Sequence, residues 1–332
     1  MTRRCEVLLL GHGYTGRLIR AQLIDRGVEV VTADLRSIAD ERVDARATES
    51  VRAALTRHRP RWVVNATSRM IDTAVPTLCA AVAAGCGYLD VSGEPASIAK
   101  LYKAFPAAPV PVVAGCGFEF AVGETALEQA LRSVSGPART VTVDYHMRNF
   151  WPSNGSALSG LTMADELGRA ALLPTAGRYY QDWPGGERVV AARRHPETSV
   201  DIRFSIGARG WASYLLGLAA PRDTPLLRSL LTLPGTPSGP PGFVRRRCAY
   251  TITALATAPT GSGSAVAEGT DPYGLSARLV ADALALPIPP GVHTPVQAIG
   301  PHLIEHATDF RITWHRRATT RHDHDDSHPA LG

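Results

Sequence analysis

In the stretch Val7-Leu-Leu-Leu-Gly-His-Gly-Tyr-Thr-Gly16, a short apolar run passes directly into a glycine-rich turn. The residues that follow, Arg17–Arg26, have the apolar spacing of an amphipathic helix, and Val28–Ala33 is a second β-prone run that ends at Asp34. A G-x-G-x-x-G turn between a strand and a helix, with an acidic residue after the next strand, is the pattern of dinucleotide-binding sheets. The sequence therefore predicts a Rossmann-type fold that binds NAD or NADP.

The alternation of strands and helices continues to about residue 135. Further strands are expected at Trp62–Asn65, Tyr88–Val91 and Val110–Ala114, with a helix after each. This alternation predicts an α/β fold with a doubly wound parallel sheet, in which ligands bind beyond the carboxyl ends of the strands. The loops at those ends contain the residues expected to bind the dinucleotide: Gly11, His12, Gly13, Tyr14, Thr15, Gly16, Asp34, Arg36, Asn65, Ala66, Thr67, Ser68 and Gly117.

The end of the second predicted strand, Ala33-Asp-Leu-Arg36, bears on the choice of cofactor. A carboxylate at this place accepts hydrogen bonds from both ribose hydroxyls and repels a 2′-phosphate, so Asp34 favours NAD. Arg36 offers a cation that could stack on adenine or hold that phosphate. The sequence therefore favours NAD and leaves NADP open.

After residue 135 the pattern changes to that of a second α/β domain, expected to bind the substrate. Strands are expected over Thr140–His146, Glu187–Ala192, Ser199–Ile206 and Arg247–Thr257. They predict a mixed or antiparallel sheet. A loop is expected over 151–160, and helices over 161–173 and 275–286. The domain boundaries are thus placed at 1–135 and 136–270, and the polar tail 317–332 is expected to be disordered.

Composition excludes several classes of protein. Of the 332 residues, 45% are hydrophobic and 20% are charged, which suits a globular chain with a sizeable core. The net charge of +5 is scattered along the chain, so no nucleic-acid partner is expected. The five cysteines are widely spaced and form no CxxC pair, which argues against a disulfide framework or a bound metal. Because no apolar stretch reaches the roughly 18 residues of a membrane span, we expect a cytoplasmic protein without a membrane partner.

Motifs in both halves of the chain carry a family resemblance. The first half contains Gly11-His-Gly-Tyr-Thr-Gly-Arg17, Val63-Val-Asn-Ala-Thr67, Gly87-Tyr-Leu-Asp-Val-Ser-Gly-Glu94 and Gly115-Cys-Gly-Phe118. These motifs resemble the nucleotide-binding half of saccharopine dehydrogenase-like oxidoreductases. The second half contains Gly155-Ser-Ala-Leu-Ser-Gly-Leu-Thr162, Gly269-Thr-Asp-Pro-Tyr273 and Gly291-Val-His-Thr-Pro295, and is similar to the trans-acting enoyl reductase branch. The resemblance implies a nicotinamide-dependent enzyme whose C-terminal helical segment, 271–312, packs back on the first domain.

Few side chains are placed to do chemistry in such an enzyme. Glu94 would contact the nicotinamide ribose or act as an acid, or else it is a charge at a helix N-terminus. His146 is either a proton donor or a structural histidine. Ser159 and Thr162 would bind a substrate carbonyl oxygen, or else cap a helix. The loop at Glu119 departs from the aspartate patterns of the relatives, so no catalytic role is carried over to that residue.

Three functions stay open on this sequence. The first is reduction of a conjugated C=C bond of the enoyl thioester kind in a biosynthetic pathway, acting on a small molecule or on an acyl group borne by an acyl carrier protein. Arg245, Arg246 and Arg247 are a basic cluster that would dock such an acidic carrier, or else a solvated strand edge. The second is an imine or amino-acid reductase of the saccharopine dehydrogenase type. The third is a nucleotide-sensing protein without catalysis; a homo-oligomer is also left open.

Overall fold

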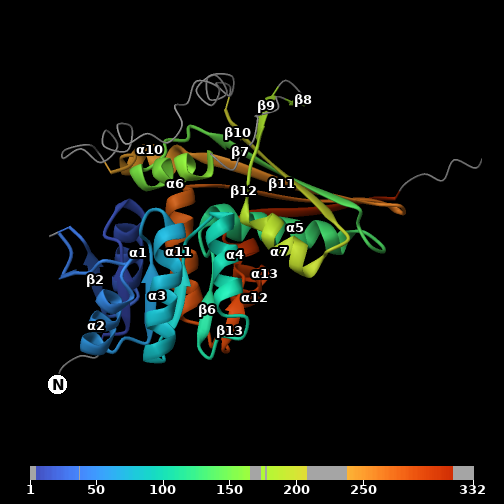
Figure 1. Ribbon diagram of the computed structural model, residues 1–332. Helices are drawn as coiled ribbons and strands as arrows, with labels where there is room; N and C mark the ends of the chain where they lie inside the picture. The colour runs from blue at the N-terminus through green and yellow to red at the C-terminus, as the bar shows by residue number, and fades with distance from the viewer. Residues whose placement is uncertain (1–4, 37, 165–172, 176–177, 208–237, 317–332) are drawn as a thin grey trace, which may run out of the picture.

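The structure is a computed structural model that describes residues 5–36, 38–164, 173–175, 178–207 and 238–316. The described residues leave out 165–172, which is most of the helix expected over 161–173, and the tail 317–332. The described chain forms two seven-stranded sheets that are linked by helices (Figure 1).

The first sheet is entirely parallel, with strand order β13-β6-β5-β4-β1-β2-β3. Its strands are β1 (Val7–Leu10), β2 (Val30–Asp34), β3 (Glu41–Arg42), β4 (Trp62–Asn65), β5 (Gly87–Asp90), β6 (Pro111–Val113) and β13 (Gly291–His293). From β1 the chain first adds β2 and β3 on one side of the sheet and then β4, β5 and β6 on the other. In parallel sheets a ligand crevice lies where the strand order reverses in this way, here between β1 and β4. The predicted Rossmann-type, doubly wound sheet is confirmed.

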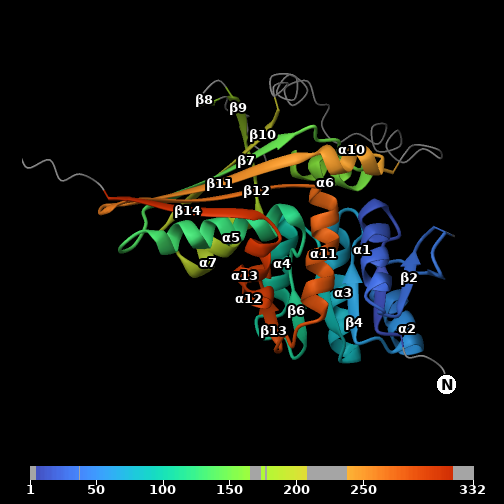
Figure 2. The same cartoon turned by 180° about the vertical axis from the view of Figure 1, so that it is seen from behind.

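Helices cover both faces of this sheet (Figures 1 and 2). On one face lie α2 (Thr48–His58), α3 (Met70–Ala84) and α4 (Pro95–Ala104); on the other lie α1 (Tyr14–Asp25), α5 (Phe118–Ser133) and α11 (Pro272–Leu284). All four residues of β1 are buried because both faces are covered, which explains the unbroken apolar run. Leu8 and Leu10 face α2 and α3, whereas Val7 and Leu9 face α1 and α5.

The second sheet has the order β14-β12-β11-β7-β10-β9-β8. Its strands are β7 (Thr140–Arg148), β8 (Leu173–Thr175), β9 (Arg178–Asp182), β10 (Ser199–Ile206), β11 (Ala249–Ala258), β12 (Gly261–Thr270) and β14 (Asp309–Arg316). Strands β7 and β10 pair in parallel and the other pairs are antiparallel, so the sheet is mixed, as predicted. The remaining helices are α6 (Asn154–Ala164), α7 (Gly186–Arg194), α10 (Gly242–Arg247), α12 (Pro295–Ile299) and α13 (Pro301–His306).

Helix α5 lies between the two sheets and joins them through one core (Figure 2). Its buried residues belong to one apolar cluster with Val64 and Leu89 of the first sheet and Val143 and Ile252 of the second. Small residues of β12 allow the helix to come close: a Cβ added to Gly263 would lie 1.8 Å from the Ser133 hydroxyl oxygen. Gly263 of β12 is therefore required for this close packing. The Gly- and Ser-rich composition of β12 also explains why the sequence did not predict a strand there.

The strand predicted over Glu187–Ala192 is wrong, because these residues belong to helix α7. The adjacent β-branched residues Val189 and Val190 suggested a strand. The buried positions, however, are Glu187, Val190 and Ala191, which share one helical face.

Two further expectations need correction. The stretch 151–160 was expected to be a loop, but α6 already begins at Asn154, and the Ser153 hydroxyl caps it by accepting from the Ser156 amide at 3.1 Å. The segment 271–312 was expected to be helical, yet it also supplies β13 to the first sheet and the start of β14 to the second. Within it, α11 lies against α1, where Arg26 and Asp282 form an ion pair at 2.7 Å.

Candidate functional site

A cavity of about 1420 Å³ lies between the strand ends of the first sheet and the second domain. Two parts of its wall differ in origin. The nucleotide half is formed by the first domain: Gly11, Gly13–Thr15, Asp34–Arg36, Asp44–Arg46 and Ala66–Arg69. The substrate half carries apolar side chains of the second domain: Met147, Phe150, Leu158, Met163, Trp183 and Phe204. Glu94, just before α4, and Glu119, in the first turn of α5, lie on the wall as well.

The three glycines of the turn have three different surroundings. Gly11 has a φ of +92°, and a Cβ on it would lie 2.6 Å from the Ala66 carbonyl oxygen. A Cβ on Gly16 would lie 1.9 Å from the Gly11 carbonyl oxygen, so this glycine allows α1 to pack on the turn. A Cβ on Gly13, in contrast, would meet only the Arg36 guanidinium, at 3.9 Å. The space over Gly13 at the N-terminus of α1 is therefore open, and it fits a pyrophosphate.

Asp34 and Arg36 stand together at the end of β2. The Asp34 carboxylate accepts from the His12 amide at 2.7 Å and pairs with the Arg36 guanidinium at 3.0 Å. Burial acts to raise the pKa of Asp34, but the hydrogen bonds from Arg36 and from the His12 amide outweigh it and hold that pKa below its ordinary value. Asp34 is thus an ionised acceptor, as ribose binding requires, and its partner Arg36 is half exposed and able to turn.

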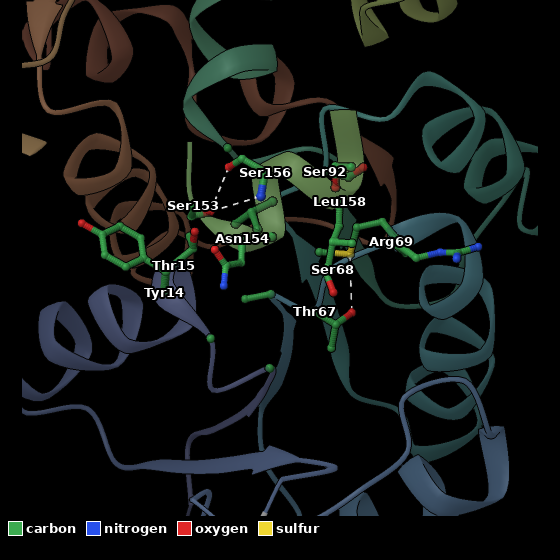
Figure 3. A pocket seen from close by; sticks show the side chains of 18 of the residues that line it. Tyr14, Thr15, Thr67, Ser68, Arg69, Ser92, Ser153, Asn154, Ser156 and Leu158 are labelled. Carbon is green, nitrogen blue, oxygen red and sulfur yellow. Dashed lines mark hydrogen bonds between the residues drawn. The ribbon is translucent and has the colours of Figure 1, made fainter. Parts of the chain in front are cut away.

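The loop after β4 is held by a small hydrogen-bond network. The Asn65 side chain accepts from the Thr67 hydroxyl at 2.7 Å and donates to the Thr73 hydroxyl at 3.2 Å. This arrangement leaves Ala66, Thr67 and Ser68 on the cavity wall. Figure 3 shows Thr67 and Ser68 on the side of the cavity away from Tyr14.

Asp90 fixes the two neighbouring loops. Its fully buried carboxylate accepts from the amides of Ser92 at 3.0 Å and Gly115 at 2.8 Å, and from the Tyr88 hydroxyl at 2.8 Å. Gly117, which was expected to bind the dinucleotide, lines the cavity; a Cβ on it would lie 2.6 Å from a backbone oxygen of the β5 loop. The loops that carry Glu94 and Glu119 are therefore held next to each other.

Glu94 binds the N-terminus of a neighbouring helix rather than that of its own. Its carboxylate accepts from the amides of Met70 at 3.2 Å and Ile71 at 3.0 Å, which begin α3. It also accepts from the Ser159 hydroxyl at 2.8 Å. The structure therefore brings two of the predicted catalytic residues into contact, with Ser159 as the donor and Glu94 as the acceptor.

The other two predicted catalytic residues are not brought to this point. His146 is buried on β7, and its ring nitrogen lies 3.3 Å from the Ser205 hydroxyl. Its neighbour Met147 lines the cavity, and successive side chains of a strand point to opposite faces, so His146 points away from the cavity. Thr162 lies on α6 near Ser159, but its side chain is outside the described part of the chain.

Glu119 is a site residue to which the sequence assigned no role. It lies in the first turn of α5 and lines the cavity, and its Oε1 accepts from the Trp183 indole N–H at 2.6 Å. Burial raises the pKa of Glu119 to about 6, with Glu94 adding to the shift and the Trp183 hydrogen bond opposing it. The available signal was an acidic residue directly after the Gly115-Cys-Gly-Phe loop.

Behind Glu119 a tyrosine and a second glutamate are fully enclosed. The Tyr145 hydroxyl contacts both the Glu119 carbonyl oxygen and the Glu187 carboxyl group. One hydroxyl has one proton to give, so both contacts are hydrogen bonds only when Glu187 is protonated and donates. Burial raises the pKa of Glu187 to about 8, in keeping with a protonated group at neutral pH.

The second domain reaches over the glycine turn. The Tyr14 hydroxyl donates to the Pro240 carbonyl at 2.6 Å, and the Tyr14 ring meets the Tyr273 ring edge-to-face at 5.1 Å. The Tyr273 hydroxyl in turn accepts from the Ser153 amide at 2.7 Å, at the start of α6. Figure 3 shows Tyr14 and Thr15 next to Ser153 and Asn154. The cavity is thus enclosed at its nucleotide end by residues of both domains.

The two halves also differ in charge. Every arginine on the described wall pairs with a nearby aspartate: Arg36 with Asp34, Arg46 with Asp44 and Arg69 with Asp72. Glu94 and Glu119 have no cationic partner among the described residues. The substrate half adds the stacked rings of Trp183 and Phe204, whose centroids are 5.0 Å apart. Its described wall is therefore aromatic and acidic.

Within the described ranges there is no group of three or more side chains that could hold a metal ion. Among the helices of those ranges, none is long and apolar enough to cross a membrane. Of the predicted carrier-docking cluster, Arg245 is paired with Asp271 at 3.0 Å, whereas Arg246 and Arg247 are exposed on α10.

Comparison with known proteins adds a likeness in fold. No protein-family model matches this chain, and no curated protein matches its sequence. The structure is similar to that of apo histidine-tagged saccharopine dehydrogenase (L-Glu forming) from Saccharomyces cerevisiae, with a TM-score of 0.53 and 11% identity over 93% of this chain and 99% of that one. It is also similar to amine dehydrogenase from Mycobacterium smegmatis, with a TM-score of 0.50 and 11% identity over 89% of this chain and 96% of that one. At this level of identity the two matches show a shared fold of two α/β domains.

Proposed function

We propose that the protein is a NAD(P)-dependent reductase of a polarised double bond. One observation carries the proposal: the open space over Gly13 belongs to the same cavity as the aromatic side chains of the substrate half and the carboxyl groups of Glu94 and Glu119. The turn Gly11–Gly16 would hold the pyrophosphate, and Asp34 would accept from the ribose hydroxyls. When bound, a reduced nicotinamide supplies a hydride. The two solved structures of the same fold are named as dehydrogenases, which supports an enzyme over a nucleotide sensor.

The leading substrate is a conjugated enoyl thioester. The sequence resemblance supports it, and so does the apolar wall of Met147, Leu158 and Met163, which suits an acyl chain. Ser159 is less suited to the thioester oxygen than the sequence implied, because its hydroxyl proton is already donated to Glu94. A protonated Glu119 and backbone amides would have to supply the donors instead.

A C=N substrate is the second candidate, and the charge of the wall favours it. Glu94 and Glu119 would attract a protonated imine or an amine, since neither has a cation beside it in the described chain. The same wall disfavours the amino-acid variant of this candidate. A substrate carboxylate would meet two glutamates and no arginine of the described substrate half.

An acyl carrier protein stays a proposed partner. Arg246 and Arg247 are exposed on α10, beside Phe243 on the same helix, and an acidic carrier would find both charge and an apolar contact there. Arg245 is not part of the proposed docking surface, because it forms an ion pair with Asp271 at the start of α11.

The test has two steps. Calorimetric titration with NADH and NADPH should show binding of at least one of them, and the absence of both would overturn the proposed function. Oxidation of the bound dinucleotide is then followed with a carrier-bound enoyl thioester, a free enoyl thioester, a cyclic imine and a keto acid with an amine. Turnover of either enoyl substrate supports the first candidate, turnover of the imine alone supports the second, and binding without any turnover indicates a sensor.

A further inference from the structure

We propose that Glu119 is the catalytic acid of this site and delivers a proton to the substrate double bond. The inference rests on the proposed reductase function and names a carboxyl group of the described wall that has no cationic partner and one unengaged oxygen.

Glu119 has the geometry for this role. Its Oε1 is held by the Trp183 indole, so the plane of the carboxyl group is fixed. Its Oε2 lies 3.2 Å from the place of a Cβ on Gly93 and has no hydrogen-bond partner among the described residues. This oxygen is therefore next to the loop that carries Glu94, and the residue lines the cavity together with Gly93 and Trp183.

The other candidates are already committed. Glu94 accepts from two amides of α3 and from the Ser159 hydroxyl, so both of its oxygens act as acceptors and that hydroxyl has no second proton. His146 points away from the cavity. The Tyr145 proton is directed to the Glu119 carbonyl or to Glu187. Of these four groups of the described chain, Glu119 is the one that lines the cavity and keeps a carboxyl oxygen without a described hydrogen-bond partner.

The groups around Glu119 favour its neutral form. Glu94 faces it from the loop after β5, and Glu187 lies behind it on the far side of Tyr145. Neither of these neighbours carries a positive charge. The aromatic surfaces of Trp183 and Phe204 exclude water from one side. Burial raises the pKa of Glu119 to about 6, which lets the group hold a proton and release it near neutral pH. Two carboxyl groups with different surroundings thus take different roles, Glu119 as the acid and Glu94 as a fixed acceptor.

As hydride from the reduced nicotinamide adds to one end of the substrate double bond, the Oε2–H bond of Glu119 breaks and its proton adds to the other end. Two electrons have then moved from nicotinamide to substrate, and the product is saturated at that bond. Glu119 is left as a carboxylate that accepts from the Trp183 N–H, and it regains a proton from water once the product has left.

The first test needs no cofactor. Because Trp183 contacts the Glu119 carboxyl group, its fluorescence should change with the protonation of that group, with a midpoint near pH 6. Glu119→Gln and Trp183→Phe should each abolish this transition, and Glu197→Gln, at an exposed acid elsewhere, should retain it. A transition near pH 6 that persists in Glu119→Gln would overturn the assignment.

The second test separates this inference from the proposed function. In Glu119→Gln, kcat should fall by about 10²–10⁴-fold with the dinucleotide Kd unchanged, and the pH dependence of kcat near 6 should vanish. Glu119→Asp should restore part of the rate, and Glu197→Gln should leave it unchanged. If the wild-type protein turns over a substrate and Glu119→Gln does so equally fast, the acid is misassigned while the reductase function stands. If the wild-type protein binds neither NADH nor NADPH, the reductase function itself is overturned.

Discussion

The two halves of the cavity differ in what they offer to a ligand. The nucleotide half offers mainly backbone, at the turn Gly11–Gly16, and each arginine of its described wall is paired with an aspartate. The substrate half offers side chains, namely the aromatic rings of Trp183 and Phe204 and the carboxyl groups of Glu94 and Glu119. Under the proposed function, binding of the dinucleotide should depend on the open space and backbone geometry of the turn, whereas chemistry and selectivity should depend on these few charged and aromatic groups.

The largest effect is expected where the space over Gly13 is filled. Its φ of −79° suits any residue, so Gly13→Val should leave the fold intact while its side chain occupies the pyrophosphate site. We expect the Kd for NADH to rise about 100-fold or more, with little change in Tm. The control is Gly160→Ala on α6, in the substrate half, where a Cβ meets nothing within 4 Å. Normal NADH binding by Gly13→Val would contradict the role of the turn.

A smaller effect is expected where the nucleotide half uses a side chain. Asp34→Ala removes the carboxylate that repels a 2′-phosphate and releases Arg36 from its ion pair. The ratio of NADPH to NADH affinity should rise about tenfold, a change of about 1.4 kcal/mol. Arg36→Ala should shift the ratio the other way. Titration of each variant with both dinucleotides measures it, and an unchanged ratio in both would show that this pair does not select the cofactor.

Glu187, the buried acid behind the substrate half, should affect the free energy of unfolding rather than ligand binding. The pKa of Glu187 is raised by burial from 4.5 to about 8, so the folded state holds its proton more tightly than the unfolded state. The contribution of Glu187 to stability is then fully present below pH 4.5 and is lost as the pH rises towards 8. In Glu187→Gln the side chain can still hydrogen-bond Tyr145 but does not titrate, so its contribution to stability should not fall as the pH rises.

Urea unfolding at several pH values measures this difference. The wild-type protein should lose stability relative to Glu187→Gln by a few kcal/mol between pH 5 and pH 8. Parallel stability curves for the two proteins would mean that Glu187 is ionised at neutral pH in the folded state.

The smallest effect is expected outside the cavity. Changing Arg246 and Arg247 together to Glu should slow reduction of a carrier-bound acyl substrate several-fold, mainly through KM, because the surface contact is exposed and screened. A free thioester should be reduced at the same rate as before. Arg245→Glu is the contrasting variant, since loss of the Asp271 ion pair should lower Tm instead. Equal slowing of both substrates by the double variant would exclude carrier docking at α10.

The fold of the first domain could be predicted because its signals are local. The run from Val7 to Gly16 places strand, turn and helix within ten residues, and Asp34 closes the next strand at a fixed distance. The parallel sheet followed from the same alternation. Such features need no knowledge of distant contacts.

The substrate half could not be predicted in the same way, because its members come from separate elements. Glu119 begins α5, Trp183 follows β9 and Phe204 lies on β10, and only the packed second sheet brings them together. The sequence left His146 open as a proton donor or a structural histidine, since a histidine on a strand is visible in sequence while the direction of its side chain is not. The contact between Ser159 and Glu94 joins residues 65 positions apart and was equally hidden.

The position of α5 between the two sheets has an evolutionary consequence. Substitutions at its buried positions disturb both sheets at once, so the helix that presents Glu119 has little freedom to vary. Phe150 and Phe204 are partly buried at the margin of that core, and Met147 extends from the core to the cavity wall, so a change in size at these positions alters the cavity directly. Descendants of this chain should therefore diversify in the molecules they accept while inheriting the same proton donor. Laboratory evolution towards new acceptors should yield its gains at those three positions first.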